Sequence, residues 1–284
     1  MAESDTDRAE LELLTETLRK TLTAATGHEL DAALAALGWP DLLDDLPDLA
    51  VPLVFRLLGE TGAHASVLND VIRHAAGWTG TDPVPLPFAG GGFVIWDSDG
   101  TAGGAVDEEL ALRTTPDGAE IPSEALAEIP SEALAEIPSE ALAAGRRALG
   151  WWLLGTGHTM LALARRHAIE RTQFGRPLAS FQAVRHRLAE TLVALDGAEA
   201  ALTIADGELG ALLAKAAAGQ AALTAARHCQ QVLGGIGFTA EHDLQRHIRR
   251  TLVLDGLLGS ARELTREAGA LIRAAGSAPR LAQL

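Results

Sequence analysis

Residues Glu170 to Glu190 read ERTQFGRPLASFQAVRHRLAE, and this stretch decides how the rest of the chain is interpreted. A long apolar run, residues 143–167, comes before it, and an amphipathic run starts at Gln182. Between the two runs the chain passes through Phe174-Gly175-Arg176-Pro177, and glycine and proline are the residues that most often end regular structure. The stretch therefore predicts a corner between two long helices.

The run before the corner is apolar almost all round, as is typical of a helix buried inside a bundle. Further helices are predicted after the corner over residues 182–207 and 208–233, then a stretch that opens at Asp243 and a final helix over residues 259–275. Long helices joined by short connections pack as a bundle. Residues 144–284 are therefore predicted to be a C-terminal four-helix-bundle domain.

The composition favours helices along the whole chain. Ala and Leu are abundant, Tyr is absent, and only 4% of the residues are aromatic, whereas sheets favour β-branched and aromatic residues. Apolar residues recur at helical spacing over residues 4–25, and shorter helices are predicted over 29–37, 49–59 and 64–76. These form an N-terminal helical module, residues 1–80, and the predicted fold class is mainly α.

The middle of the chain has a different composition. Residues 81–118 are rich in Gly, Pro, Asp and Thr with short apolar pieces, which indicates two or three strands or, equally, a collapsed loop. An identical eight-residue unit, EIPSEALA, then begins at Glu120, Glu128 and Glu136. Because each unit has a proline, a continuous helix is interrupted. Residues 119–143 are predicted to be a mobile surface segment that arose by tandem duplication.

The charge and the cysteine count exclude several classes of partner and site. A formal net charge of −15 argues against nucleic acid or an anionic membrane as the main partner. The single cysteine, Cys229, excludes an internal disulfide, and no group of residues with metal-ligand spacing is present. The N-terminus is acidic and polar, unlike a signal peptide, and no run of about 18 apolar residues is uninterrupted. We expect a cytoplasmic protein with no metal.

The corner has residue types that suit an anionic, aromatic cofactor. Arg171 offers a planar fork of donors for phosphate oxygens, and Phe174 can lie against an aromatic ring. Gln182 adds an amide at the start of the next helix. Sixty residues after Arg171, Gln231 precedes Gly234-Gly235-Ile236-Gly237, where a backbone without side chains can approach a ligand closely. Taken singly, these features have ordinary explanations as helix ends.

In this order and at this spacing, the Arg-x-Gln-Phe-Gly-x-Pro corner and the run QVLGGIGFT from Gln231 resemble the two signatures of the acyl-CoA dehydrogenase family. The resemblance implies binding of flavin adenine dinucleotide (FAD) and α,β-dehydrogenation of an acyl-CoA thioester. It aligns Arg171, Phe174 and Gln182 with cofactor contacts from one subunit. It aligns Gln231, Gly234 and Gly235 with contacts to a cofactor held mainly by the neighbouring subunit, so an oligomer is expected.

Two departures from the family pattern limit what this chain can do alone. The family's central β-domain is reduced to the Gly-rich segment, so a complete flavin pocket is not expected. The Glu-Gly-Thr of the loop before the last helix is replaced within residues 254–259, and the alternative Glu position, 26 residues before Arg171, is Gly145. The catalytic base is therefore unknown. Asp255 is a candidate only if its short side chain reaches the substrate and burial raises its pKa.

A chain with flavin contacts but no base and no β-domain resembles the smaller subunit of the heteromeric α2β2 acyl-CoA dehydrogenases that bacteria use on steroid-derived CoA thioesters. The predicted function is a subunit, inactive alone, that completes the FAD site at an interface with a catalytic partner subunit. The alternative is a flavin-free helical scaffold that binds the same kind of partner. The acyl group, the electron acceptor and the identity of the partner stay open.

Overall fold

Helix α7 (Ser139–Glu170) is the axis of the fold and confirms the buried helix predicted before the corner. The computed structural model describes residues 2–80, 84–96, 106, 109–114 and 137–277 of the chain. Consecutive side chains of α7, Trp152, Leu153 and Leu154, are all fully buried, as a helix enclosed on every side requires. It packs against α4 (Pro47–Thr61) of the N-terminal module and against α9 (Gly207–Leu233) of the C-terminal half.

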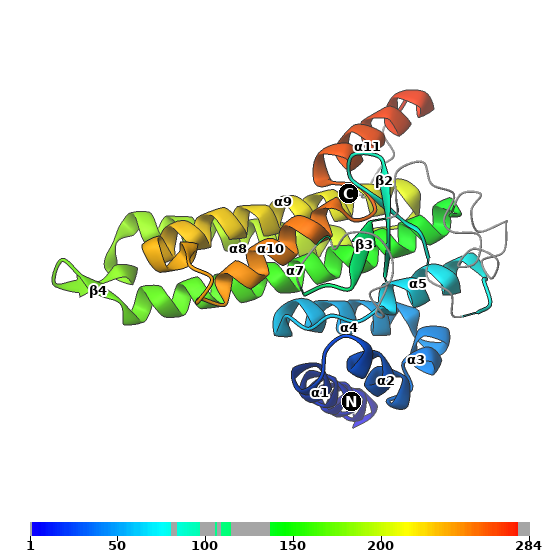
Figure 1. Ribbon diagram of the computed structural model, residues 1–284, viewed down its shortest axis with the longest axis horizontal. Coiled ribbons are helices and arrows are strands. Elements are labelled where there is room, and N and C mark those ends of the chain that lie inside the picture. The colour runs from blue at the N-terminus through cyan, green and yellow to red at the C-terminus, as the bar shows by residue number, and fades with distance from the viewer. Residues whose placement is uncertain (1, 81–83, 97–105, 107–108, 115–136, 278–284) are drawn as a thin grey trace.

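The C-terminal half is the predicted helical bundle. Helices α8 (Gln182–Thr203), α9 and α10 (Leu244–Gly256) lie alongside α7 (Figure 1), and α11 (Ala261–Ala275) packs against α9. The N-terminus of α11 is fixed by a capping box between Ser260 and Glu263. The mainly α prediction is confirmed.

By length and composition α9 is the one helix in the described part of the chain that is able to cross a membrane. Most of the window concerned, 61%, is buried inside the molecule. Its small side chains, including Ala218, Ala222 and Ala225, pack in the core, and Cys229 is buried among them. Burial raises the pKa of the Cys229 thiol to about 12, so this side chain behaves as a small hydrophobe.

The N-terminal module has one helix more than predicted. It consists of α1 (Ala2–Ala24), α2 (His28–Ala36), α3 (Trp39–Asp45), α4 and α5 (Val67–Ala76). The additional helix is α3, which begins directly after Gly38 in a stretch where no helix was predicted. Gly38 is the N-cap with a φ of 84°, and Pro40 lies in the first turn, where its missing N–H costs nothing.

The described part of the middle segment has three strands, which agrees with one of the two alternatives left open. Strands β1 (Leu86–Phe88), β2 (Gly92–Trp96) and β3 (Leu112–Thr114) form an antiparallel sheet in that order. The sheet is tied to the end of α10, since Ala89 N donates to Gly256 O at 2.8 Å and Leu258 N donates to Pro87 O at 2.7 Å. It therefore covers the connection between α10 and α11.

The repeat lies mostly outside the described residues. Of its 24 positions only the last seven, Ile137–Ala143, are described, and they lead directly into α7. Ala141 and Ala143 are buried. Helix α7 therefore starts at Ser139, before the predicted domain boundary at residue 144, and the prediction of a mobile segment falls on earlier units, which lie outside the described residues.

Candidate cofactor site

The predicted corner is a short β-hairpin. After α7 ends, β4 (Thr172–Gln173) pairs with β5 (Arg176–Pro177), and the turn consists of Phe174 and Gly175. Both turn residues have positive φ, 53° and 78°, as a two-residue type I′ hairpin turn requires. Gly175 adopts this conformation without strain, whereas Phe174 does so at a cost. The hairpin projects beyond the end of the bundle (Figure 1).

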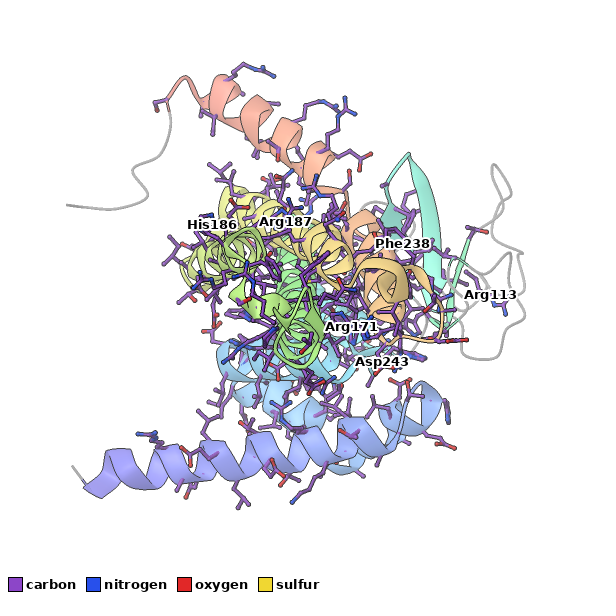
Figure 2. The ribbon with its side chains drawn as sticks, turned by 90° about the vertical axis from the view of Figure 1, so that its left-hand side faces the viewer. Arg113, Arg171, His186, Arg187, Phe238 and Asp243 are labelled. Atoms are coloured by element: carbon purple, nitrogen blue, oxygen red, sulfur yellow. The ribbon has the colours of Figure 1, made fainter. Side chains whose placement is uncertain are left out.

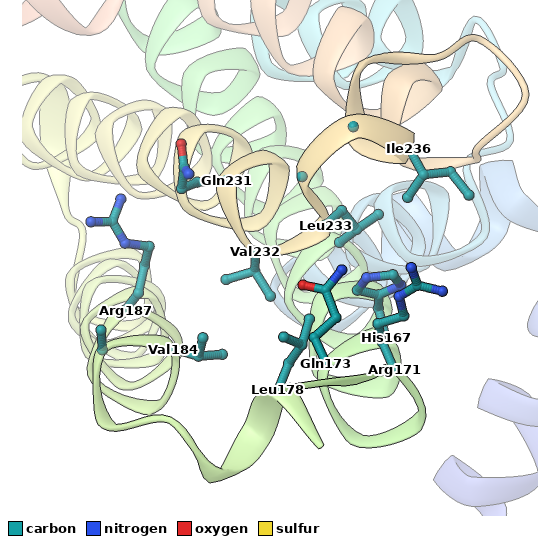
Figure 3. A pocket seen from close by; sticks show the side chains of 13 residues that line it. His167, Arg171, Gln173, Leu178, Val184, Arg187, Gln231, Val232, Leu233 and Ile236 are labelled. Carbon is teal, nitrogen blue, oxygen red and sulfur yellow. The ribbon is translucent and has the colours of Figure 1, made fainter. Parts of the chain in front are cut away.

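A pocket of about 870 Å³ lies beside this hairpin, between the C-terminal end of α7, the start of α8 and the end of α9. Its polar lining is contributed by His167, Arg171, Gln173, Arg187 and Gln231, and the backbone of Gly234 and Gly235 forms part of its wall. Val184, Val232 and Leu233 supply an apolar floor (Figure 3). The pocket thus joins segments that lie sixty residues apart in the sequence.

The electrostatics of this pocket favour an anion. None of the described residues that line it is acidic, although the chain as a whole has a formal charge of −15. Burial, with further contributions from His242 and Arg171, lowers the pKa of His167, so its imidazole is neutral at pH 7. The two guanidiniums and the amide N–H groups are therefore the charged and polar donors available to a ligand.

The structure brings together four of the six residues predicted to bind cofactor: Arg171, Gln231, Gly234 and Gly235. These residues line one pocket of a single chain, and their predicted division between cofactors of two subunits stays a prediction. A single anionic ligand in this pocket can contact both signatures.

The other two predicted residues, Phe174 and Gln182, are not among the pocket's lining residues. Phe174 is 88% exposed at the hairpin tip, where its ring makes an edge-to-face contact with Phe181 at 6.1 Å. Gln182 turns its amide toward His186, with 3.3 Å between Nε2 atoms.

Three polar residues of the pocket were missed by the sequence reasoning: His167, Gln173 and Arg187. A signal for Arg187 was present in the sequence. Ala183, Val184 and Arg187 have the spacing that places side chains on one face of a helix, and Val184 belongs to the apolar floor. Gln173 and His167 flank Arg171 at a hairpin whose shape the sequence did not define.

Asp255 lies elsewhere and is engaged in structure. It belongs to the last turn of α10 and not to the loop before the last helix, because α10 continues to Gly256. Its Oδ1 accepts a hydrogen bond from Ala261 N at 3.1 Å, at the start of α11. Lys215 Nζ donates to the backbone carbonyls of Asp255 and Gly259 at 3.0 and 2.6 Å.

The loop before the last helix has no carboxylate. It consists of Leu257, Leu258 and Gly259, followed by the N-cap Ser260. A Cβ on Gly145, the alternative Glu position, would lie 2.8 Å from Leu258 Cδ1 and 3.0 Å from Ile72 Cγ1. Gly145 therefore adjoins the loop before the last helix, and apolar side chains fill the space between them.

Comparison with known proteins agrees with this geometry. Residues 135–270 match the family model described as acyl-CoA dehydrogenase, C-terminal domain. The acyl-CoA dehydrogenase IpdE2 of Mycobacterium tuberculosis is 38% identical over 118 residues, which are 40% of this chain and 36% of that protein. The acyl-CoA dehydrogenase FadE34 of the same organism is 37% identical over 130 residues, 42% of this chain and 18% of that protein. The matches thus span about a third or less of these relatives.

Two solved structures share the fold over nearly the whole chain. One is a variant of the Tcur3481-Tcur3483 steroid ACAD, with a TM-score of 0.68, 20% identity, and coverage of 94% of this chain and 99% of that chain. The other is the ChsE4-ChsE5 complex from Mycobacterium tuberculosis, with a TM-score of 0.61, 18% identity, and coverage of 96% and 98%. The described chain therefore has an acyl-CoA dehydrogenase-like fold, and its residues 135–270 match the C-terminal domain of acyl-CoA dehydrogenases.

Proposed function

We propose that this chain is a subunit of a cytoplasmic, FAD-dependent acyl-CoA dehydrogenase that acts on a CoA thioester. In this assignment the chain contributes the nucleotide end of a cofactor site at a subunit interface, and a partner subunit provides the catalytic base. Alone, the chain is inactive.

The proposal depends mainly on one observation: among the described residues, no acidic side chain lines the pocket, although the chain as a whole is acidic. Arg171, Gln231 and the Gly234-Gly235 backbone line it together, and these residues suit the phosphates and ribose of an adenine dinucleotide. A guanidinium pairs with phosphate oxygens through two parallel hydrogen bonds, and small residues allow the ligand to approach the backbone closely. The donor set therefore fits the adenosine diphosphate portion of FAD.

The remainder of the flavin requires a partner. When bound, FAD supplies the hydride acceptor of the reaction. The described middle segment of this chain consists of three short strands that pack on the α10–α11 connection. We infer that the flavin ring and the thioester are held mainly by the other subunit.

The position of the base also points to a partner. Neither the loop before α11 nor position 145, the two places at which the family resemblance locates a base, has a carboxylate in this chain. Asp255 serves the N-terminus of α11 instead. Proton abstraction is therefore assigned to the partner.

The two solved structures suggest the form of the assembly. The Tcur3481-Tcur3483 steroid ACAD and the ChsE4-ChsE5 complex are each named after two different chains. We take these as models for a hetero-oligomer, α2β2, with a steroid-derived CoA thioester as the substrate class.

The alternative is a flavin-free scaffold of the same fold. It is favoured by the outward placement of Phe174 and Gln182, which leaves two of the predicted cofactor residues outside the pocket. Under this alternative the pocket residues have no effect on flavin content.

Two substitutions in the assembled complex test the proposal. Arg171→Lys keeps a positive charge but loses the planar fork, so we expect flavin retention to weaken by a factor of about ten or more, equivalent to about 1.4 kcal/mol. Asp255→Ala is expected to leave turnover per assembled complex within about threefold, since losing a true general base typically costs a factor of about 10² to 10⁴.

The measurements are flavin absorbance after gel filtration and initial rates normalised to assembled complex. An inactive Asp255→Ala complex with normal flavin content and normal assembly would move the base onto this chain. Unchanged flavin content in Arg171→Lys and in Arg171→Ala would favour the scaffold.

A further inference from the structure

A second cavity lies in the N-terminal module, away from the cofactor pocket. Its volume is about 960 Å³, within the range of sites for small organic ligands. Arg171 and Arg187 of the cofactor pocket lie at the end of the bundle that faces the viewer in Figure 2, whereas α3 and α5, which line the second cavity, lie toward the opposite end (Figure 1). The two pockets share none of their described lining residues.

The cavity also differs from the space beside Gly145. Ile72 of α5 faces α7, because a Cβ on Gly145 would lie 3.0 Å from Ile72 Cγ1. The described residues of α5 that line the cavity include Asn69, Asp70 and Arg73 but not Ile72. The cavity therefore lies along another face of α5 and apart from the loop before α11.

Buried polar atoms on the cavity wall have no hydrogen-bond partner among the described residues. Asn69 and Trp96 line the cavity and are each only 3% exposed, yet Asn69 Oδ1 and Trp96 Nε1 are both unpaired. Arg73 Nε is unpaired as well, although Nη1 of the same side chain donates to Gly80 O at 3.1 Å. Leaving a buried polar atom unpaired is costly, so these atoms indicate a bound polar group.

The unpaired atoms specify the chemistry of that group. Asn69 and Arg73 are four residues apart on α5, and side chains at this spacing are neighbours on one helix face. Asn69 Oδ1 needs a donor, whereas Arg73 Nε needs an acceptor. A hydroxyl has one donor and two acceptor lone pairs, so it satisfies both atoms, whereas an ammonium has no acceptor and a carboxylate has no donor.

The charges of the wall also favour a neutral group. The described lining residues include one arginine and the carboxylates of Asp31, Asp44 and Asp70, so an anion is disfavoured. The carboxylates offer a cation no free counter-ion, because each already has a partner. These partners, all within 3.0 Å, are Ser66 N for Asp31, Trp39 Nε1 for Asp70 and His74 Nδ1 for Asp44.

Aromatic rings supply the apolar part of the wall. Three of the chain's five tryptophans, Trp39, Trp78 and Trp96, line the cavity and offer a large surface to a hydrocarbon ring. We propose that this cavity is a binding site for a neutral cyclic alcohol, whose hydroxyl pairs with Asn69 and Arg73 while its ring packs against the tryptophans. This site is independent of the proposed cofactor site.

Three probes built on one rigid hydrocarbon cage test the class of ligand. Adamantanol, adamantylamine and adamantanecarboxylate are neutral, cationic and anionic, respectively, at neutral pH. Calorimetric titration of the purified chain measures the affinity for each. We expect adamantanol to bind at least about tenfold more tightly than the other two, equivalent to about 1.4 kcal/mol.

Two substitutions of Asn69 test the contact itself. Asn69→Leu nearly keeps the volume but removes the acceptor, so the affinity for adamantanol should fall about tenfold. Its urea midpoint should not fall, because the atom that is lost had no partner. Asn69→Asp keeps an acceptor and should hold the affinity for adamantanol within about threefold, while the added charge raises the affinity for adamantylamine.

Several results would overturn this inference. If none of the probes binds to the unmodified chain, the cavity holds only water. Tighter binding of adamantylamine or of adamantanecarboxylate than of adamantanol would exclude a neutral alcohol as the ligand class. Equal affinity for adamantanol in Asn69→Leu and in the unmodified chain would exclude the contact with Asn69. Flavin content of the assembled complex should be unchanged in Asn69→Leu, and a parallel loss of flavin would show general damage to the fold instead of a local contact.

Discussion

Lys215 is the most deeply buried charged side chain that the structure describes, and its position explains how the α10–α11 connection is held. It is 0% exposed on α9, and its ammonium donates to the carbonyls of Asp255 and Gly259. Asp255 lies in the last turn of α10, where carbonyls have no helical partner, and Gly259 lies in the loop before α11. The lysine thus fixes the loop that contains Leu258.

The pKa of Lys215 makes the stability of the fold depend on pH. Burial, opposed in part by Asp255, lowers its pKa from 10.5 to about 7. Between about pH 7 and pH 10 the unfolded chain binds a proton at this residue that the folded chain does not. The free energy of unfolding contributed by Lys215 therefore rises with pH over this window, and below pH 7 the full cost of the buried charge is present.

Lys215→Met tests this prediction. We expect the unmodified chain to gain stability relative to the variant as the pH rises from 7 to 10, because the variant has no proton to lose. Urea unfolding at several pH values measures the difference. Parallel pH profiles for the two proteins would contradict the lowered pKa of Lys215.

At the scale of single residues, the sequence identified only those pocket residues that belong to a recognisable motif. Arg171, Gln231, Gly234 and Gly235 were predicted because a helix end and a Gly-rich turn placed them in a recognisable pattern, and they line the pocket. Phe174 and Gln182 lie outside it because the direction of a side chain depends on the hairpin turn and the rotamer, which sequence spacing does not fix. Asp255 was placed in a loop because Asp-Gly reads as a turn, whereas α10 includes both residues.

At the scale of elements, the crossing of α4 and α7 shows how the N-terminal module is joined to the bundle. Gly59 on α4 and Gly155 on α7 meet so closely that a Cβ on Gly155 would overlap the carbonyl oxygen of Arg56. A Cβ on Gly59 would lie 2.5 Å from Thr156 N. The two helices therefore approach with backbone against backbone, which only glycine permits.

Gly155→Ala is expected to destabilise the fold by about 1–3 kcal/mol, because overpacking forces the two helices apart. Gly269→Ala on α11 is the matched control, since a Cβ there meets nothing within 4 Å. Where the added Cβ meets no neighbour, replacing a helical glycine by alanine is expected to raise the free energy of unfolding by about 0.5–1 kcal/mol. Chemical denaturation of both variants measures the difference, and equal stabilities would show that the crossing tolerates a wider separation.

The repeat gives a second prediction at this scale. Deleting residues 128–143 yields the same sequence as deleting residues 120–135, because the units are identical. One unit therefore remains before Ala144 and can supply the first turn of α7, where Ala141 and Ala143 are buried. We expect the melting temperature to fall by less than about 4 °C, as for a change confined to a surface loop. A fall of more than about 8 °C would show that the deleted units pack against the core.

The elements that the sequence predicted best are those in which apolar side chains recur with a clear period. The long helices were foreseen because apolar side chains recur with the helical period over many turns, and α7 was recognised as buried because it is apolar all round. Helix α3 was missed because a proline after a glycine marks both a break and a helix start. The three strands were ambiguous, since runs of three to five residues are too short for the alternation of a strand to stand out.

At the scale of the whole molecule, the charge is divided between two regions. Residues 165–187 carry +5 while the chain carries −15, and the cationic end bears the pocket and the projecting hairpin with the exposed Phe174. An apolar tip surrounded by arginines is suited to burial against another subunit, because Arg and Phe are enriched in interfaces. The loop before α11, where the family resemblance locates a base, lies away from this end (Figure 1) and is covered by the small sheet. In the proposed function, this cationic end supplies the nucleotide contact, and the partner supplies most of the surface for the flavin ring.

This division predicts how the chain behaves with and without its partner. Purified alone, it should be colourless or only faintly yellow, since Arg171 is placed to hold the nucleotide but the described middle segment has only three short strands. Co-expression with an acyl-CoA dehydrogenase subunit that carries the base should bring in flavin at fewer than one per chain of the complex. Absorbance spectra together with mass measurement of the assembly test both statements. A full equivalent of tightly bound flavin in the isolated chain would show that it builds a complete site by itself, and the assignment of the ring and the base to a partner would then be wrong.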